Sequence, residues 1–301
     1  MAFAAAFDLH QCATVARAAR WRMDAQTSGR LCRLVVIEAG GRALHALRRG
    51  DGKICAAFRR SVYLRAGDGS LACLGDAGLG RGPLNARVAD SCAWHALAVG
   101  DRVELDLGGA QAWQPAPCAR RVPPRAALQE NLASLQRAAA GAVPRQGLGP
   151  ALIGAATMLV RDARPALVAL DGWLDQGGAP PVRARRLLGL GPGLTPSGDD
   201  YLAGMLLALR ATGRAADADA LWNGLHAVAP HRTHPISHAH LAAAAAGEAG
   251  EAVQQCVAAL CGDAPVRWPL PLRQLGTVGH CSGWDALAGA AAVARAALRA
   301  H

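Results

Sequence analysis

The sequence is poor in lysine and in aromatic residues. Lys53 is the only lysine among 32 basic residues, and Phe, Trp and Tyr together account for 4% of the 301 residues. The net charge is +10, but the arginines are scattered, and the short clusters that begin at Arg17 and Arg183 contain few aromatic neighbours. Nucleic-acid-binding surfaces concentrate basic residues on one face and place aromatic side chains between them. We therefore expect no nucleic-acid partner, whereas small anionic substrates remain compatible with the charge.

Long apolar runs and paired cysteines are also missing. No stretch of 18 uninterrupted apolar residues occurs, so we expect no membrane-spanning helix. The nine cysteines are widely spaced, and none forms a Cys-x-x-Cys pair. Asp8 and Arg17 interrupt the apolar start of the chain, which lacks the basic beginning of an export signal. These absences predict reduced thiols and a cytoplasmic protein.

The patterns that are present predict an α+β protein. Short apolar and β-branched segments separated by glycine turns dominate residues 1–115, after a short N-terminal helix, and predict a small antiparallel barrel or sandwich. Residues 116–124 form a proline-rich linker, and residues 125–301 have the apolar spacing of an all-helical domain. The strands are expected at residues 31–38, 43–47, 54–58, 62–64, 71–74, 84–88 and 103–107. The helices are expected at residues 125–140, 150–170, 182–188, 197–211, 215–228, 235–246, 248–260 and 282–299.

The most distinctive stretch is a glycine-rich loop that runs into a helix. It reads Gly-Leu-Gly-Pro-Gly-Leu-Thr-Pro-Ser-Gly-Asp-Asp over residues 189–200. Pro196 disfavours helix before Ser197, and the glycines allow backbone angles that other residues resist. Ser197 is expected to cap the helix, with Asp200 as the acid of a capping box. Asp199 is then the acid without a role in capping, so it is the acid most free to act.

The same helix start occurs again 85 residues later. Ser-Gly-Asp-Asp-Tyr-Leu-Ala-Gly at 197–204 matches Ser-Gly-Trp-Asp-Ala-Leu-Ala-Gly at 282–289 at six of eight positions. The small residues predict two closely packed helices with neighbouring N-termini. Helix N-termini offer N–H groups and a partial positive charge, so two of them together would bind phosphate or carboxylate. Two well-capped structural helices are the alternative, because Ser-x-x-Asp starts many helices.

Both copies supply candidate site residues. The expected anion-binding residues are Gly191, Gly193, Thr195, Ser197, Gly198, Asp200, Ser282 and Gly283. Asp199 and Asp285 are candidate catalytic acids. His280 is a third catalytic candidate, because a helix N-terminus would lower its pKa and keep the imidazole neutral. Cys281 is a weaker nucleophile candidate, and Asn85 in an N-terminal loop either faces a ligand or closes a turn.

A histidine-rich segment at residues 226–240 precedes the second copy. His234 and His238 have the spacing of metal ligands on a helix, but Pro235 lies between them and predicts a helix start that leaves His234 outside. A solvated turn is therefore favoured, and no metal ligands are assigned. A hydroxyl group before the proline is expected to cap this third helix start. Two hydroxyl residues here join the substrate-binding candidates, namely Thr233 and Ser237.

Three segments together resemble the signature blocks of a bacterial family long catalogued as a domain of unknown function. They are the glycine-rich loop with its helix, Thr-His-Pro-Ile-Ser at 233–237, and Gly-His-Cys-Ser-Gly-Trp-Asp at 279–285. One family member is the H subunit of the oxamate carbamoyltransferase of allantoin breakdown. The resemblance implies an assembly of three different subunits that interconverts oxalurate and phosphate with oxamate and carbamoyl phosphate. The Ser-Thr-Arg-Thr phosphate loop of aspartate and ornithine carbamoyltransferases is absent, so their fold and mechanism are not transferred.

Three functions stay open on this reading of the sequence. The first is a catalytic carbamoyltransferase subunit that acts on small anions, the second is a non-catalytic subunit that senses such an anion, and the third is a scaffold. Other carbamoyltransferase subunits are the implied partners. Asp199, Asp200 and Asp285 do not suit a bare anion, so they either cap their helices or hold a divalent metal or a carbamoyl NH₂ group. No cofactor is assigned, and a divalent metal is left open.

Overall fold

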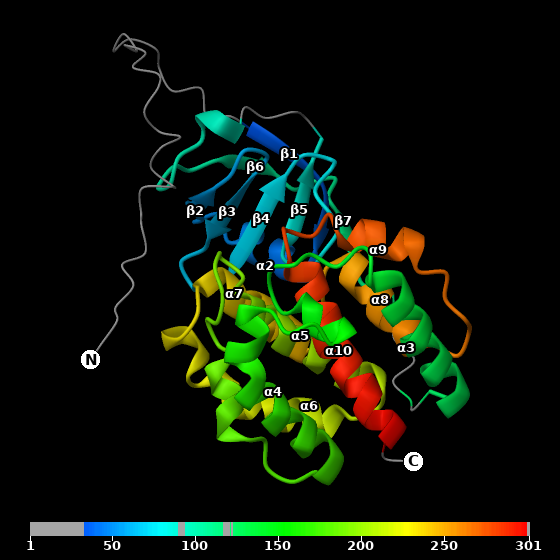
Figure 1. Cartoon of the computed structure of the whole chain (residues 1–301). Helices are drawn as coiled ribbons and strands as arrows, with labels where there is room; N and C mark the ends of the chain where they lie inside the picture. Colours follow the sequence, from blue (N-terminus) through cyan, green and yellow to red (C-terminus); the bar gives the residue numbers. More distant parts are fainter. Residues whose placement is uncertain (1–32, 90–93, 117–120, 122, 300–301) are drawn as a thin grey trace, which may run out of the picture. The chain divides into compact units, whose positions relative to one another are not determined.

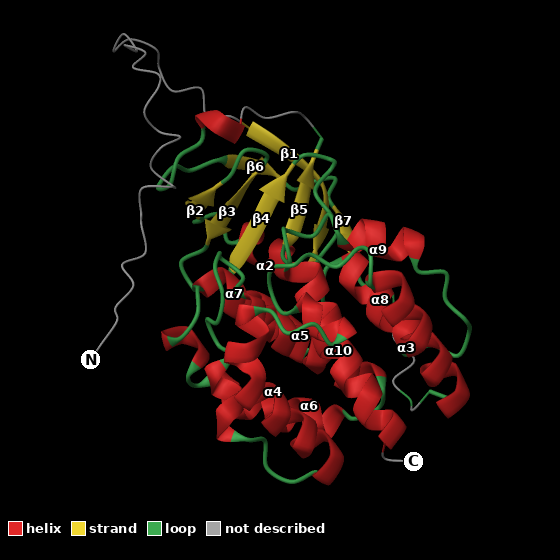
Figure 2. Cartoon of the chain, viewed as in Figure 1, coloured by secondary structure: helices red, strands yellow, loops and turns green. Residues whose placement is uncertain are grey.

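The computed structural model describes residues 33–89, 94–116, 121 and 123–299, so the predicted N-terminal helix lies outside the described residues. From Arg33 onward the chain forms one compact unit. A mixed sheet comes first and a helical region follows (Figures 1 and 2). The predicted α+β class is therefore confirmed, whereas the division of the chain at residues 116–124 stays a prediction.

Seven strands in the described residues form one open sheet. Its order is β2-β3-β4-β5-β1-β6, and β7 also pairs with β1. The pairs β1–β6, β1–β7 and β4–β5 are parallel, so the predicted antiparallel barrel or sandwich is wrong. The strands are β1 (Arg33–Gly40), β2 (Lys53–Ala57), β3 (Ser61–Arg65), β4 (Leu71–Gly75), β5 (Asn85–Val88), β6 (Glu104–Asp106) and β7 (Gln111–Trp113).

The segment predicted as the second strand is instead helix α2 (Gly41–Arg48). Its four buried residues, Ala43, Leu44, Ala46 and Leu47, recur at helical spacing. They belong to one core with the strand residues that face them. Short apolar runs fit a helix as well as a strand, and here packing on the sheet selects the helix. A helix therefore precedes β2, and residues 51–52 do not connect two strands of a hairpin.

The helical region largely follows the predicted segments. A short helix, η1 (Trp94–Ala96), lies earlier, between β5 and β6. The helical region itself contains α3 (Arg125–Ala139), η2 (Gly149–Ile153), α4 (Met158–Gln176), η3 (Val182–Arg186), α5 (Ser197–Ala211), α6 (Ala215–His226), η4 (Ala229–His231), α7 (Pro235–Ala245), α8 (Glu251–Leu260), α9 (Pro269–Leu275) and α10 (Ser282–Arg299). Helix α9 was not predicted. None of the helices in the described part of the chain has the length and apolar character needed to cross a membrane.

Helices α5 and α10 pack directly against each other (Figure 1). A Cβ atom on Gly204 would lie 1.7 Å from the carbonyl oxygen of Ala286, and one on Gly289 would lie 1.9 Å from that of Tyr201. Ala286 and Tyr201 occupy equivalent positions in the two sequence copies, so the contact is reciprocal. The predicted close packing of the two motif helices through small residues is confirmed.

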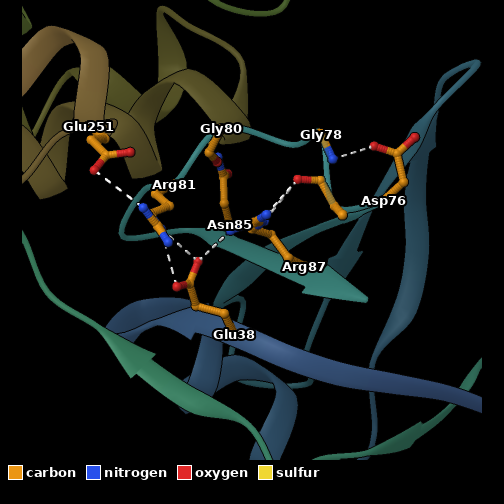
Figure 3. Close-up of polar contacts among 9 residues, drawn as sticks. Glu38, Asp76, Gly78, Gly80, Arg81, Asn85, Arg87 and Glu251 are labelled. Carbon is orange, nitrogen blue, oxygen red and sulfur yellow. Dashed lines mark hydrogen bonds and ion pairs between the residues drawn. The ribbon is translucent and has the colours of Figure 1, made fainter. Parts of the chain in front are cut away.

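The loop between β4 and β5 joins the sheet to helix α8 (Figure 3). Arg81 Nε donates to Glu38 on β1 at 3.0 Å, and the backbone oxygen of Arg81 accepts a hydrogen bond from the Glu251 amide at 2.8 Å. Asn85 Nδ2 donates to the carbonyl oxygen of Gly80 at 2.7 Å. Of the two roles considered for Asn85, the structure therefore supports the closing of a turn and not contact with a ligand.

Candidate functional site

The glycine-rich loop curls over the start of α5. Gly191 and Gly193 have φ angles of +113° and +95°, which glycine adopts far more readily than other residues. A Cβ atom on Gly191 would lie 3.0 Å from the amide nitrogen of Ser197. Helix α5 begins at Ser197, and Pro196 occupies the N-cap position without a side-chain cap. The predicted cap by Ser197 and its capping box with Asp200 are wrong, because Ser197 is already inside the helix.

The loop uses some of the N–H groups at the start of α5. The Gly198 amide donates to Leu190 at 2.9 Å, and the next two amides donate to Pro196 at 2.9 and 3.1 Å. The helix start itself is therefore less open to an anion than the sequence suggested. Other amides remain available, since in the described structure no protein acceptor is bound by those of Gly191, Gly193, Leu194, Thr195 and Ser197.

Asp199 ties the glycine-rich loop to helix α7. Its Oδ1 accepts a hydrogen bond from the Gly189 amide at 3.0 Å, and its Oδ2 accepts from the hydroxyls of Thr233 and, at 2.7 Å, Ser237. The side chain is 1% exposed. The expectation that Asp199 is the least constrained of the three acids is wrong, because both of its oxygens are bonded. The third helix start does meet the first, as the sequence indicated.

Asp285 holds a second glycine-rich turn. Its Oδ1 accepts hydrogen bonds from the amides of Leu148 and Gly149 at 2.6 and 2.7 Å. This role was not predicted, although the sequence carries a signal for it. Gly-Leu-Gly-Pro occurs at 147–150 as well as at 189–192. The first copy donates two backbone N–H groups to a motif acid, and the second copy donates one.

The two motif copies meet through hydroxyl and carboxyl groups. Thr195 Oγ1 and Ser282 Oγ are 2.9 Å apart, so the predicted proximity of the two helix starts is confirmed. Both hydroxyls lie close enough to Asp200 to lower its pKa, but burial outweighs them and raises that pKa well above its usual range. Burial also raises the pKa of Asp285 to about 6, against the hydrogen bonds that lower it. The Oδ2 atoms of both acids are buried and have no hydrogen-bond partner.

The remaining candidate residues lie at or just before the two helix starts. His280 is exposed in the turn before α10. Burial raises the pKa of Cys281 to about 11, and the charges of Asp285 and Asp200 raise it further, which disfavours the thiolate that a nucleophile requires. Gly198 and Gly283 pack against backbone, since a Cβ atom on either would lie within 2.6 Å of a carbonyl oxygen.

The histidine-rich segment begins helix α7 as expected. His234 lies outside the helix, and its Nδ1 accepts a hydrogen bond from the Ile236 amide at 3.2 Å, so the histidine and not Thr233 caps the helix. His238 stacks on Trp222 with the ring centroids 5.9 Å apart. Among the residues that the structure describes, no three His, Cys, Asp or Glu side chains are arranged to hold a metal ion.

A cavity of about 460 Å³ lies away from the motif residues. Its walls come from α2, β7, the C-terminal half of α5 and α8, and its charged lining residues are Arg210 and Glu248. Arg210 is paired with Asp219, and Glu248 is paired with Arg42. The cavity therefore presents no uncompensated charge to attract an ionic ligand.

Comparison with known proteins links the motif region to one family. No curated protein and no solved structure matches the chain. Residues 187–294, which contain the glycine-rich loop, the start of α7 and both motif copies, match the model of the family described as oxamate carbamoyltransferase subunit AllH. The resemblance drawn from the sequence motifs is thus confirmed over these residues, where the chain is similar to the AllH subunits of oxamate carbamoyltransferase.

Proposed function

We propose that this chain is a subunit of a carbamoyltransferase that acts on oxamate or a similar small anion, and that the glycine-rich loop binds the anion. The proposal depends on one observation: the region of family similarity and the meeting point of the motif segments are the same part of the molecule. The region similar to AllH subunits is where the loop, the start of α7 and the two motif helix starts converge. Its closest functional partners would be the other subunits of such an enzyme.

The chemistry of the loop suits this class of ligand. Phosphate, carbamoyl phosphate, oxamate and oxalurate are all small anions, and the amides of Gly193, Leu194 and Thr195 are not bonded within the described structure. Backbone amides near a helix N-terminus bind anions without a charged side chain. The hydroxyls of Thr195 and Ser282 add donors at the same place.

A non-catalytic, anion-sensing subunit is the second candidate function. The hydrogen bonds of Asp199 favour it, because an acid that already accepts three donors is poorly placed to abstract a proton from substrate. For either function, we propose that the protein is cytoplasmic and that nucleic acid is not among its partners. Turnover of oxalurate and phosphate by the isolated chain, compared with turnover after its co-purified partners are added, separates the two functions.

Anion binding is tested by thermal stabilisation with phosphate, in wild type and in two matched glycine variants. Gly193→Val introduces a branched side chain at φ +95°, and Gly154→Val introduces one at φ +72° after η2. Both positions have open space around the new Cβ atom, so both variants carry backbone strain. We expect only Gly193→Val to lose the phosphate-dependent rise in Tm. If phosphate and oxamate stabilise neither the wild-type chain nor its complex with partners, the proposed site is wrong.

A further inference from the structure

The cavity of about 460 Å³ lies between the sheet and the helical region. The start of α2, Pro83 and Trp113 form one wall, and Leu207, Val257 and the turn between α7 and α8 form the other. The apolar cores of the sheet and of the helical region share no residue. Small-molecule sites of this volume often occur where two separately packed parts of a protein meet, so the cavity has the size and the place of a ligand site.

Two opposite charges line the cavity side by side. A Cβ atom on Gly247 would lie 3.8 Å from Cγ of Arg210, so the arginine stem packs against the turn that carries Glu248. The two charged groups do not bond each other, because Arg210 is paired with Asp219 and Glu248 with Arg42. An ionic ligand would upset this balance and leave a desolvated charge without a partner. The pairing therefore favours an uncharged ligand.

Each of the two charged groups keeps an unused hydrogen-bonding atom. Arg210 donates through Nε to the Ala245 carbonyl oxygen at 2.8 Å and through Nη2 to Asp219. Glu248 accepts from Arg42 at Oε2, at 2.6 Å. Within the described part of the chain, Nη1 of Arg210 and Oε1 of Glu248 bond no protein group. The wall thus offers a donor beside an acceptor.

The neighbouring parts of the wall add a planar surface and no competing charge. Both amide atoms of Gln254 are already used, since its Nε2 donates to the Gly247 carbonyl oxygen at 3.2 Å and its Oε1 accepts from the Ala249 amide at 3.1 Å. Trp113 is half-buried at the end of β7, and an indole ring stacks well on other planar groups. The cavity therefore suits a flat molecule with one polar end.

We propose that this cavity binds an uncharged, planar molecule that carries a primary amide or urea group. The carbonyl oxygen of the ligand accepts from Nη1 of Arg210, an N–H of the same group donates to Oε1 of Glu248, and the planar body lies against the indole of Trp113. A carboxylate has no proton to donate to Glu248, and an ammonium group has no lone pair to accept from Arg210. None of the proposed anion-binding residues lines the cavity, so the two sites are tested separately.

Benzamide is the probe, and its binding is followed by NMR through the indole N–H signal of Trp113. The signal is assigned by its loss in Trp113→Phe. Benzamide is expected to shift it saturably with a Kd of about 1 mM or tighter. Benzoate and protonated benzylamine, which have similar shapes, should bind about 10-fold or more weakly, because each brings a like charge to Glu248 or Arg210. No saturable shift with benzamide, or equal binding by benzoate, would overturn the proposal.

Two matched glycine variants test whether benzamide binds in this cavity. Gly41 lines it, and a Cβ atom there would have no other atom within 4 Å. Gly41→Leu should therefore fill part of the cavity and weaken binding by about 10-fold or more. Gly224→Leu is the control, because it also has open space but lies in α6, outside the cavity. Equal binding by wild type and Gly41→Leu, or equal loss in both variants, would contradict the assigned place.

Glu248→Gln tests the acceptor itself. Glutamine keeps an oxygen that accepts from Arg42, but its NH₂ group can donate to a carboxylate. The ratio of benzamide to benzoate affinity should fall by about 10-fold relative to wild type, the effect of removing the like charge and adding a donor. A loss of stability alone would weaken both probes together. An unchanged ratio would therefore refute the role of Glu248 in recognising the amide.

Discussion

Replacement of Asp285 by asparagine should stabilise the protein at neutral pH and remove part of its pH dependence. The pKa of Asp285 is raised from 3.8 to about 6, chiefly by burial. An acid with a raised pKa in the folded state contributes its full stability below its unfolded pKa, and that contribution is lost as the pH rises through the folded pKa. The window for this loss therefore runs from about pH 4 to about pH 6.

The size of the effect follows from the pKa shift. A shift of about two units corresponds to roughly 3 kcal/mol between the two ends of the window. Asparagine retains an oxygen that accepts from the amides of Leu148 and Gly149, but it has no charge to bury. Relative to wild type, Asp285→Asn should thus gain up to about 3 kcal/mol in free energy of unfolding at pH 7, and little at pH 4.

Urea unfolding at several pH values between 4 and 8 measures this difference. Asp175→Asn is the control, because Asp175 is an exposed acid paired with Arg299 and should leave the pH profile nearly unchanged. Asp285→Ala should be destabilised at every pH, since it orphans two amide donors at about 1–3 kcal/mol each. If wild type and Asp285→Asn have parallel stability profiles across the window, Asp285 does not titrate there and the reasoning is refuted.

Two further predictions concern the motif helices and their acids. Gly204→Ala should lower the free energy of unfolding in urea by roughly 3 kcal/mol or more, because its Cβ atom would lie 1.7 Å from the Ala286 carbonyl oxygen. Gly224→Ala is the control: its Cβ atom would have open space in α6, so this variant should raise the free energy of unfolding by up to about 1 kcal/mol. Equal effects of the two substitutions would contradict the close packing of α5 on α10. Asp199→Asn should cost about 1–3 kcal/mol, because an NH₂ group cannot accept from Ser237 as a carboxylate oxygen does; an unchanged Tm would show that its hydrogen bonds contribute nothing.

Local sequence determined the helices and the place of the motif. The apolar spacing of residues 197–211 and 282–299 predicted α5 and α10 at their observed bounds, and the repeated small residues predicted that the two helices pack together. These features depend on neighbours within a few turns of one chain segment, which a periodic pattern records. The signature motifs also pointed to the family that residues 187–294 resemble.

The sheet and the roles of the acids were decided by tertiary structure. Residues 43–47 became a helix because packing on the sheet settled a pattern that fits either element, and the parallel strand pairs join segments that no local turn connects. Asp199 was expected to be free to act on a ligand and Asp285 to stand at a capping position, yet both accept hydrogen bonds from residues up to 137 positions away. A carboxylate at a helix start has the same local sequence whether it caps, crosslinks or titrates, and only the groups that the fold brings to it determine which of these it does.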